Sequence, residues 1–194
     1  MDKSSNKKII LDLCAGSGAW SRPYQECPEI YDVRLITLPD YDVRLYQPPK
    51  GVYGILAAPP CTEFSFAKHF HGKGNYKHDF LMGLQIVDAC LRIILVTNPI
   101  WWALENPRGY LRRWLGKPKL TFDPCDYGEP YKKKTDLWGN FVTPAFLSCT
   151  PINRKFSLLK SREIHPELYG KFSRQERRAI TPSGFAKAFF EANR

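Results

Sequence analysis

One cysteine lies in a sequence context that favours a nucleophilic role. Cys61 occupies the segment APPCTEFS, directly after the apolar run of residues 52–58. A cysteine attacks as its thiolate, which positive potential or nearby backbone donors stabilise. Most free cysteines are buried and inert, but two rigid prolines and polar neighbours such as Ser65 favour an accessible thiol here. Cys61 is therefore a candidate nucleophile, and an inert structural cysteine is the alternative.

A carboxylate and an amide follow a second apolar run. Glu105 and Asn106 come directly after the segment WWAL. Partial desolvation raises the pKa of a carboxyl group, and a carboxyl that carries a proton is suited to donate it to a ring nitrogen. Asn106 followed by Pro107 is also a good helix start, and the two roles are compatible.

A turn of small residues follows the first apolar run. After Asp12 the chain reads LCAGSGAW, and small residues let backbone N–H groups approach an anionic or carboxylate-bearing ligand. The turn lacks the full G-x-G-x-x-G of dinucleotide sites and the GxxxxGK[ST] of phosphate-binding loops. It therefore predicts either a ligand loop or an ordinary connection between a strand and a helix.

Two segments carry clusters of basic residues. Residues 64–78, FSFAKHFHGKGNYKH, place Lys68 and Lys73 among aromatic residues, with glycines that suit a mobile loop. Residues 132–134 are three lysines, which by themselves are most simply a solvated turn. The histidines of the first segment have no carboxylate or cysteine at regular spacing, so we expect no metal site.

The elements that must position these clusters can be read from the alternation of apolar runs and turns. Expected strands are Lys8–Leu13, Val33–Leu38, Val52–Ala58 and Trp101–Leu104. Expected helices are Ala19–Cys27, interrupted by Pro23, then Phe80–Thr97, whose apolar residues have helical spacing, and Phe185–Ala192. Residues 110–170 are expected to be mostly loop. This alternation predicts a mostly parallel sheet, and the three polar clusters all fall at its carboxyl edge, where ligands bind.

The composition excludes several classes of protein. The chain has 194 residues, 43% hydrophobic and 25% charged, which excludes disorder, collagen and coiled coil. No apolar run approaches the ~20 residues of a membrane span. Six scattered cysteines without a CxxC pair favour reduced thiols in a cytoplasmic protein over a zinc ribbon or a disulfide scaffold. The formal charge of +10 favours either a polyanionic partner or a solvated basic surface.

Three motifs in chain order resemble those of the cytosine-C5 DNA methyltransferase family. They are DLCAGSG from residue 12, PPCTEFS from residue 59 and ENP from residue 105. Two weaker matches follow: YGEPYKKKT from residue 127 resembles the family's basic segment, and SRQERRAITPSGFAKAFF from residue 173 resembles its closing segment. The matches extend along most of the chain, and PPCTEFS is the most specific of them.

The resemblance implies an α/β, Rossmann-like S-adenosylmethionine-dependent methyltransferase fold, with a mostly parallel sheet and helices on both faces. It implies that Cys61 adds to C6 of cytosine, that Glu105 hydrogen-bonds or protonates N3, and that Asn106 holds the two segments in place. The implied cofactor is S-adenosylmethionine. The cofactor-binding residues would be Asp12, Ala15, Gly16, Ser17, Gly18, Trp20, Asp40, Asp42, Val43 and Pro59, and the nucleic-acid-binding residues Ser65, Lys68, Lys73, Lys132, Lys133, Lys134 and Thr135.

The chain departs from the family's pattern in several places, one of which is Pro107, where the family's motif usually reads ENV. Cys14 stands where the family usually has an aromatic platform for adenine, and Thr37-Leu38-Pro39 stands where a ribose-binding carboxylate is expected, with Asp40 nearby. Residues 139–172 are too short for the family's recognition domain. We therefore expect a single catalytic domain, residues 1–194, with a loop-rich insert at 139–172 and relaxed or short sequence recognition.

By resemblance the partner is double-stranded DNA with a flipped cytosine, and we expect a cytoplasmic monomer encoded by a phage or mobile element. Two alternatives remain open at this stage. One is the same chemistry on free cytidine nucleotides or RNA, which would account for the missing recognition domain. The other is a catalytically silent nucleic-acid-binding protein, which would account for Cys14 and the missing carboxylate.

Overall fold

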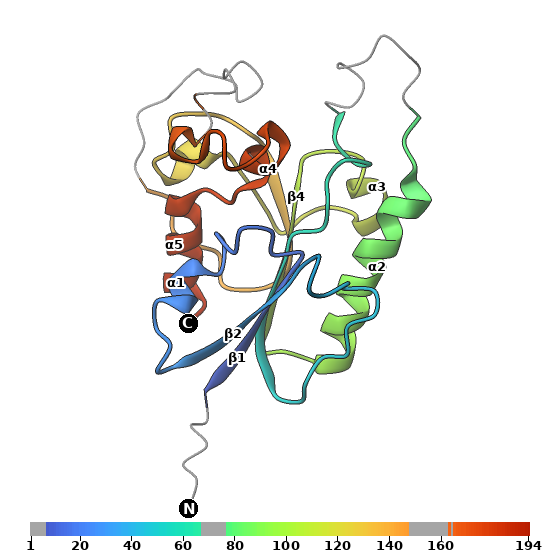
Figure 1. The fold of residues 1–194 in the computed structure, drawn as a ribbon, viewed down its shortest axis with the longest axis vertical. Helices are drawn as coiled ribbons and strands as arrows, with labels where there is room; N and C mark the ends of the chain where they lie inside the picture. Colours follow the sequence, from blue (N-terminus) through green and yellow to red (C-terminus); the bar gives the residue numbers. More distant parts are fainter. Residues whose placement is uncertain (1–6, 67–76, 148–162, 164) are drawn as a thin grey trace, which may run out of the picture.

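The computed structural model (Figure 1) describes residues 7–66, 77–147, 163 and 165–194. Its strands are β1 (Lys8–Leu13), β2 (Tyr31–Ile36), β3 (Val52–Ala57), β4 (Trp101–Pro107), β5 (Leu120–Phe122) and β6 (Thr135–Asn140). Its helices are α1 (Arg22–Gln25), α2 (Phe80–Thr97), α3 (Arg112–Leu115), α4 (Arg174–Ala179) and α5 (Ser183–Ala192), with short 3-10 helices η2 (Pro124–Tyr127) and η5 (Pro166–Leu168).

The strands form one sheet in the order β2-β1-β3-β4-β6-β5. The first four strands of that order are parallel, whereas β6 runs antiparallel to both β4 and β5. The chain moves outward from β1 to β2 and then crosses back to β3 on the other side of β1. This reversal is a topological switch point, and ligands of open α/β sheets bind beyond the strand ends there.

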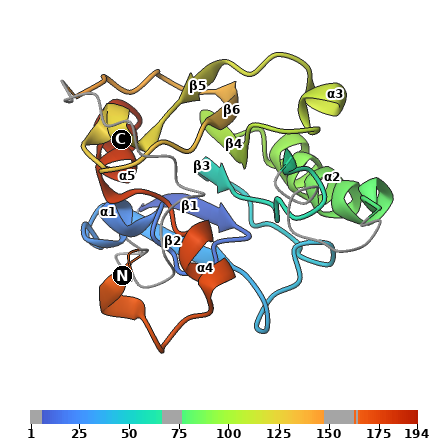
Figure 2. The same cartoon turned by 90° about the horizontal axis from the view of Figure 1, so that it is seen from above.

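Helices cover both faces of the sheet, which confirms the expected Rossmann-like α/β fold. Figures 1 and 2 show α1 and α5 on one face and α2 with α3 on the other. Under α2 the core contains Leu11, Leu13 and Ile55, and on the opposite face Trp20 packs with Phe185. Alternate residues of β1 and β3 thus serve two separate cores, as a pleated strand that is buried on both faces requires.

The longest helix matches the sequence prediction residue for residue. Asp79 caps α2 by accepting a hydrogen bond from the Met82 N–H (2.9 Å), and Asn98 ends it in a left-handed conformation. Among the described residues, α2 is the one helix long and apolar enough, by length and composition, to cross a membrane. A core helix of a soluble protein passes the same test, and six residues of α2 are buried within the protein.

The interpretation of residues 110–170 as mostly loop was wrong in part, because β5, β6 and α3 lie there. The first four residues of β6 are all buried although two of them, Thr135 and Asp136, are polar. The strand therefore lacks the alternation of apolar and polar residues by which a half-buried strand is predicted. Asp136 is fully buried and accepts hydrogen bonds from Arg112 of α3 (2.5 and 2.6 Å) and from Thr121 of β5 (2.7 Å). A polar residue at a buried strand position hides the strand from pattern analysis.

Two shorter elements also differ from expectation. Helix α1 begins at Arg22, so Pro23 lies in its first turn, where a proline is tolerated, instead of interrupting a longer helix. Helix α4 begins with a capping box in which Ser173 and Glu176 satisfy each other's backbone N–H groups. The described parts of the expected insert, 139–147, 163 and 165–172, contain the end of β6 and η5; its recognition role stays a prediction.

The buried ion pair should contribute more to stability than an exposed one of the same type. Asp136→Asn removes the charge that balances Arg112 in a buried site, so we expect it to lower the free energy of unfolding by about 2–3 kcal/mol. The matched control is Asp32→Asn, because Asp32 pairs with Arg34 (2.7 Å) while both side chains are 40% exposed; its cost should stay below about 1 kcal/mol. Urea unfolding of both variants measures the difference, and equal costs would contradict the assignment.

Candidate active site

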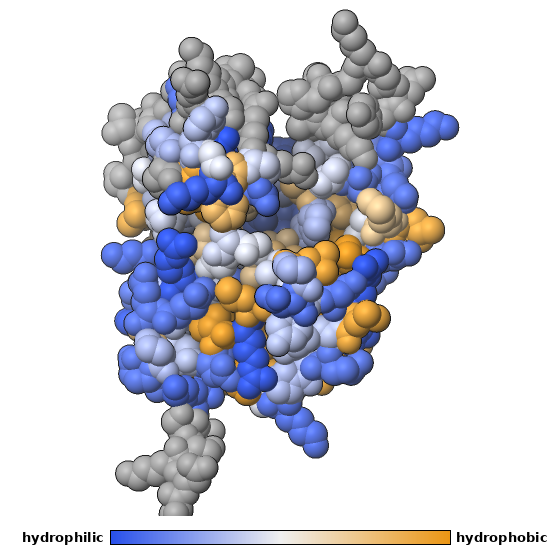
Figure 3. All heavy atoms as spheres, in the orientation of Figure 1, coloured by the Kyte–Doolittle hydropathy of each residue, from blue (hydrophilic) through white to orange (hydrophobic). Residues whose placement is uncertain are grey.

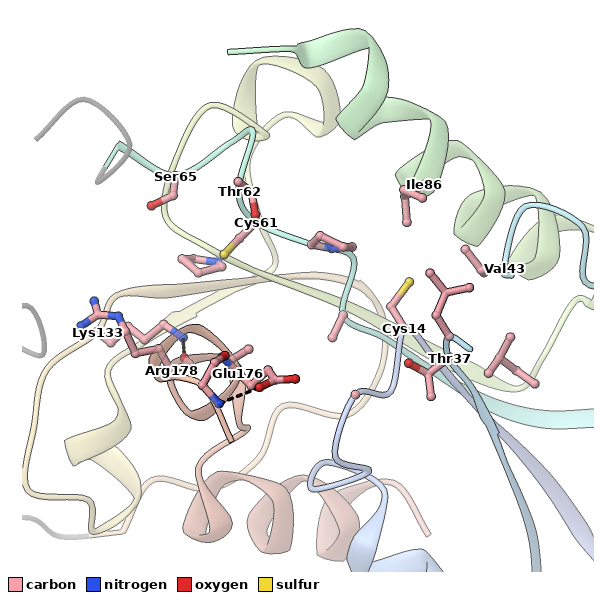
Figure 4. Close-up of a pocket in the computed structure, with 18 of the residues that line it drawn as sticks. Cys14, Thr37, Val43, Cys61, Thr62, Ser65, Ile86, Lys133, Glu176 and Arg178 are labelled. Atoms are coloured by element: carbon pink, nitrogen blue, oxygen red, sulfur yellow. Dashed lines mark hydrogen bonds between the residues drawn. The ribbon is translucent and has the colours of Figure 1, made fainter. Parts of the chain in front are cut away.

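A cavity of about 1380 Å³ lies at the carboxyl edge of the sheet, at the switch point. The loops that follow β1, β2 and β3, the last residue of β4 and the segment that precedes β6 all contribute to its lining. Figure 3 shows the molecule hollowed on this side, and Figure 4 shows the side chains that face the hollow. The polar clusters that sequence analysis placed at separate strand ends therefore meet around one space.

One end of the cavity is mainly apolar. Cys14 from the loop after β1, Val43 from the loop after β2 and Ile86 from α2 line it together (Figure 4). The carboxylate of Asp42 lies at the same end and is paired with Arg44 (2.5 Å), which lowers its pKa to about 2. This end therefore offers apolar walls for a flat ring and an ionised carboxylate that can accept a hydrogen bond.

The loop after β1 approaches the cavity through its backbone. Cys14 has a φ of 58° and Gly16 a φ of 54°, and a Cβ added to Gly16 would meet no atom within 4 Å. Both residues line the cavity. Gly16 therefore leaves room for a ligand to come close to the main chain.

A network of hydrogen bonds that begins at the buried side chain of Asp12 stabilises this loop. The Asp12 side chain is 1% exposed and accepts a hydrogen bond from the Ser21 hydroxyl (2.5 Å), while Gln25 donates to Ser21 (2.9 Å) and to the Gly18 carbonyl (3.1 Å). Burial raises the pKa of Asp12 to about 7, and the Ser21 hydrogen bond only partly offsets this. The network holds the loop in shape, although Asp12 itself does not line the cavity.

The other end of the cavity holds Cys61. The Phe64 and Ser65 N–H groups donate to the Cys61 carbonyl (3.0 and 2.9 Å), so the residue opens a tight turn just after β3. Its side chain is partly exposed and lines the cavity. Burial of the sulfur raises the pKa of the thiol; the Lys133 ammonium opposes this effect, and Glu105 adds to it.

Glu105 lies on the adjacent strand, on the face that β4 turns toward α5. Its carboxyl lines a second, small cavity of about 10 Å³ beside Tyr131, Thr135 and Thr181. Burial raises the pKa of Glu105, Lys133 lowers it, and Asp136 raises it. The structure thus provides a carboxyl group that holds a proton more readily than an exposed one.

Lys133 lies between Cys61 and Glu105 in its electrostatic effect. It lines both cavities, and its charge acts on the pKa of Cys61 and of Glu105. Its ammonium donates a hydrogen bond to the Arg178 carbonyl at the end of α4 (3.0 Å), and Figure 4 shows this bond beside the Cys61 sulfur. A carbonyl in the last turn of a helix attracts a cation, so α4 fixes the position of the lysine.

The predicted site residues separate into three groups by location. Lining the large cavity are Gly16, Asp42, Val43, Cys61, Ser65, Lys132, Lys133 and Lys134. Outside its lining are Asp12, Ala15, Ser17, Gly18, Trp20, Asp40, Pro59, Glu105, Asn106 and Thr135. Lys68 and Lys73 lie outside the described residues.

Two members of the second group have clear structural roles. Trp20 is buried and packs its ring against Phe185 and Phe189. Asn106 is fully buried, and its amide donates to the Pro59 carbonyl (2.9 Å). These side chains support the loops around the cavity without facing it.

Sequence analysis missed the contribution of α4. Ser173, Glu176 and Arg178 line the cavity opposite Cys61, although they lie more than 110 residues further along the chain. The charge of Arg178 lowers the pKa of Cys61. The S-x-x-E capping signature of α4 was available in the sequence, but nothing in it indicates that the helix returns to the nucleophile.

The electrostatic link can be tested on the thiol alone. Lys133→Gln removes the charge that favours the thiolate, so Cys61 should be alkylated by iodoacetamide only at higher pH than in the parent chain. At pH 8 we expect its alkylation rate, followed by mass spectrometry, to fall several-fold. Lys134→Gln is the matched control, because Lys134 also lines the cavity but pairs with Asp123 (3.2 Å). Equal pH profiles for the two variants would refute the link.

Asp12 predicts an unusual pH dependence of stability. Its pKa is about 7 in the folded chain, against an ordinary value of 3.8, so between those values the folded state binds more protons than the unfolded state and stability falls as pH rises. Asp12→Asn removes this loss and can still accept from Ser21. We expect the gain in unfolding free energy to be larger at pH 8 than at pH 5, by on the order of 2 kcal/mol.

Urea unfolding at the two pH values measures this gain. Asp88→Asn, at an exposed position of α2, serves as the control and should show no pH-dependent gain. If Asp12→Asn shifts stability equally at pH 5 and pH 8, the carboxyl does not titrate as described.

Comparisons with known proteins add a likeness among solved structures. No protein-family model and no curated protein matches the chain. Among solved structures, a prophage-encoded E. coli protein described as a candidate DNA modification methyltransferase is similar, with a TM-score of 0.48 and 16% sequence identity. The alignment covers 69% of this chain and 47% of that one, so the chain spans about half the length of the structure it matches.

Proposed function

We propose that this chain transfers a methyl group from S-adenosylmethionine to C5 of cytosine in DNA, through a covalent bond between Cys61 and C6 of the base. One observation carries the proposal. A partly exposed thiol and a lysine line one end of a large cavity, and the same lysine lines the small cavity beside it, which holds a carboxyl whose pKa is raised by burial. The other end is apolar and carries a carboxylate.

The reactive end supplies what an attack on C6 needs. Cytosine C5 is a weak nucleophile until a thiolate adds at C6, which makes C5 an enamine-like carbon. The Cys61 sulfur would form the bond to C6, while Glu105 donates its proton to N3 and removes the negative charge that builds up on the ring. Lys133 favours the thiolate before the attack. After methylation the C5 proton leaves to water, the N3 proton returns to Glu105 and the Cys61 thiolate leaves C6, so the aromatic ring and both side chains are restored.

The residues at the apolar end fit the proposed cofactor. When bound, S-adenosylmethionine supplies an electrophilic methyl group on its sulfonium. Cys14, Val43 and Ile86 give apolar contact for its adenine ring, and Asp42 can accept from a donor on the adenine or the sugar. Gly16, with nothing within 4 Å of a would-be Cβ, leaves room for the methionine end. The cavity volume of about 1380 Å³ exceeds the usual range for a single small ligand, which fits two occupants.

The missing aromatic platform has a local substitute. Leu38 and Tyr41 line the cavity near Val43, and both side chains are largely exposed. They come from the same loop after β2 that lacks the expected carboxylate. Contact from this loop would replace the stacking that Cys14 cannot provide.

DNA is the proposed substrate because cations gather at the mouth of the cavity. Lys132, Lys133 and Lys134 line it directly, and the whole chain carries a charge of +10. Phosphate contacts supply most non-specific affinity for nucleic acid. Incubation with labelled S-adenosylmethionine and, separately, duplex DNA, RNA and a free cytidine nucleotide tests this choice. Transfer to the free nucleotide alone, or to RNA alone, would overturn it, and tight DNA binding without transfer would indicate a silent binding protein.

Two substitutions test the assigned chemistry. Cys61→Ser should abolish methyl transfer to DNA, since a serine hydroxyl is a far weaker nucleophile. Glu105→Gln keeps a hydrogen-bond donor but cannot give up a proton, so we expect transfer to fall by about 10²–10⁴-fold. Scintillation counting of labelled duplex measures both.

Cys27→Ser is the matched control, because Cys27 is a partly exposed free cysteine outside the cavity lining. It should retain full activity. Undiminished transfer by Cys61→Ser would refute the covalent mechanism, whereas a loss in the Cys27 control as well would point to misfolding.

A further inference from the structure

A strongly basic segment of the chain lies beside the cavity but outside it. Residues 106–122 contain five arginines and lysines and no acidic residue. Two of the five are engaged within the fold: Arg112 pairs with Asp136, and Lys119 donates to the Phe141 carbonyl and lies over its ring. The other three, Arg108, Arg113 and Lys117, are exposed, so their charges face the surroundings.

This segment is physically continuous with the nucleophile loop. Ser65, which lines the cavity, forms a β-bridge with Gly109, and the Tyr110 N–H donates to the Phe64 carbonyl (2.8 Å). The approach is so close that a Cβ on Gly109 would lie 2.1 Å from the Phe64 oxygen. On the other side, the Arg108 N–H donates to the Lys134 carbonyl (2.9 Å). The basic segment therefore extends the mouth of the cavity toward α3.

Aromatic side chains hold one of these cations in place. The Arg113 guanidinium lies over the Tyr110 ring at 4.6 Å. Tyr110 in turn contacts the rings of Phe66, His78 and Phe80, with centroids 4.8–5.5 Å apart. When a guanidinium stacks on an aromatic ring, its N–H groups point outward in the guanidinium plane and stay able to donate hydrogen bonds. This arrangement suits the recognition of a phosphate.

The neighbouring Trp114 adds an unusual exposed surface. Its side chain is 57% exposed between Arg113 and Lys117. Figures 1 and 2 show α3, which carries it, beside α2 and on the opposite face of the sheet from α1 and α5. A free nucleotide that occupies the cavity has no phosphate that extends along this outer surface, whereas a polynucleotide does.

We propose that Arg108, Arg113, Trp114 and Lys117 form a docking surface, here called the α3 surface, for the phosphate backbone of double-stranded DNA. The inference rests on the proposed function, because it assumes that the reacting base enters from a duplex at the adjacent mouth. The α3 surface would hold the strand on one side of that base. It supplies affinity without reading sequence, since contacts to phosphate position a protein but do not specify bases.

A salt titration of DNA binding tests the α3 surface. Each phosphate contact contributes about 0.9 to the slope of log K against log salt concentration on duplex DNA. For the double variant Arg113→Gln/Lys117→Gln we expect the slope, measured by fluorescence anisotropy on a labelled duplex of about 20 base pairs, to fall by roughly 1.8. The apparent affinity near 100 mM salt should fall on the order of tenfold.

The matched control removes the same charge from the other face. Arg22 of α1 and Lys187 of α5 are both exposed, and Arg22→Gln/Lys187→Gln also lowers the net charge by two. We expect its salt slope to equal that of the parent chain. Equal losses in both double variants would show that net charge alone matters and would overturn the α3 surface, as would losses confined to single-stranded DNA or RNA.

The same variants separate this inference from the proposed function. If the parent chain methylates duplex DNA and the α3 variant binds and methylates it as well as the control variant does, the docking surface is refuted and the function stands. If the parent chain transfers no methyl group to any substrate, but the salt slope of duplex binding falls as predicted in the Arg113→Gln/Lys117→Gln variant, the proposed function fails and the α3 surface stands. Melting temperatures within about 2 °C of the parent chain establish that both double variants are folded.

Discussion

Beyond the paired part of β3 and β4, a buried side-chain hydrogen bond joins the segments that carry Cys61 and Glu105. The Asn106 amide donates to the Pro59 carbonyl (2.9 Å), and Asn106 is fully buried. Pro59 precedes Cys61 by two residues, and Asn106 follows Glu105 directly. The bond therefore ties the thiol to the carboxyl beyond the last paired residues of β3 and β4, Ala57 and Leu104, where the sheet itself no longer fixes their separation.

The charges around the cavity depend on that fixed separation. Burial raises the pKa of both Cys61 and Glu105, and each would resist ionisation if it stood alone. Lys133 opposes the shift at both groups from one position, held by the carbonyl of Arg178. A carboxyl with a raised pKa close to a thiol that must lose its proton fits the division of roles that the proposed chemistry needs.

Sequence reasoning located the parts of the fold that depend on local pattern. The strands β1, β3 and β4 and the helix α2 are apolar runs bounded by turn residues, and their expected bounds agree with the structure to within a few residues. The residues of the reactive end were also named in advance, because Cys61 and Glu105 follow directly on such runs. Pattern could not show β6, whose Asp136 is polar and fully buried.

The positions that α4 and Trp20 take in the folded chain could not be predicted from the sequence, because they depend on tertiary contacts. Helix α4 begins with its capping box at Ser173, and the hydrogen bond from the Lys133 ammonium to the Arg178 carbonyl joins it to the cavity lining. Neither contact can be predicted from the spacing of residues along β1–β4. Likewise Trp20 follows the glycine turn in sequence but packs into the core under α5, since the choice between facing a ligand and facing Phe185 is decided by tertiary packing.

The reversed direction of β6 constrains how the rest of the chain reaches the cavity. Its first residue meets the end of β4 at Pro107 and its last pairs with Trp102 at the start of that strand, so the chain leaves β6 at the edge of the sheet farthest from the reactive groups. The segment 141–147 leads back, and the Leu147 N–H donates to the Asp126 carbonyl of η2 (3.0 Å). Seven residues of the expected insert are thus used to traverse the height of the molecule. The described residues 141–147 are therefore committed to this return path to η2.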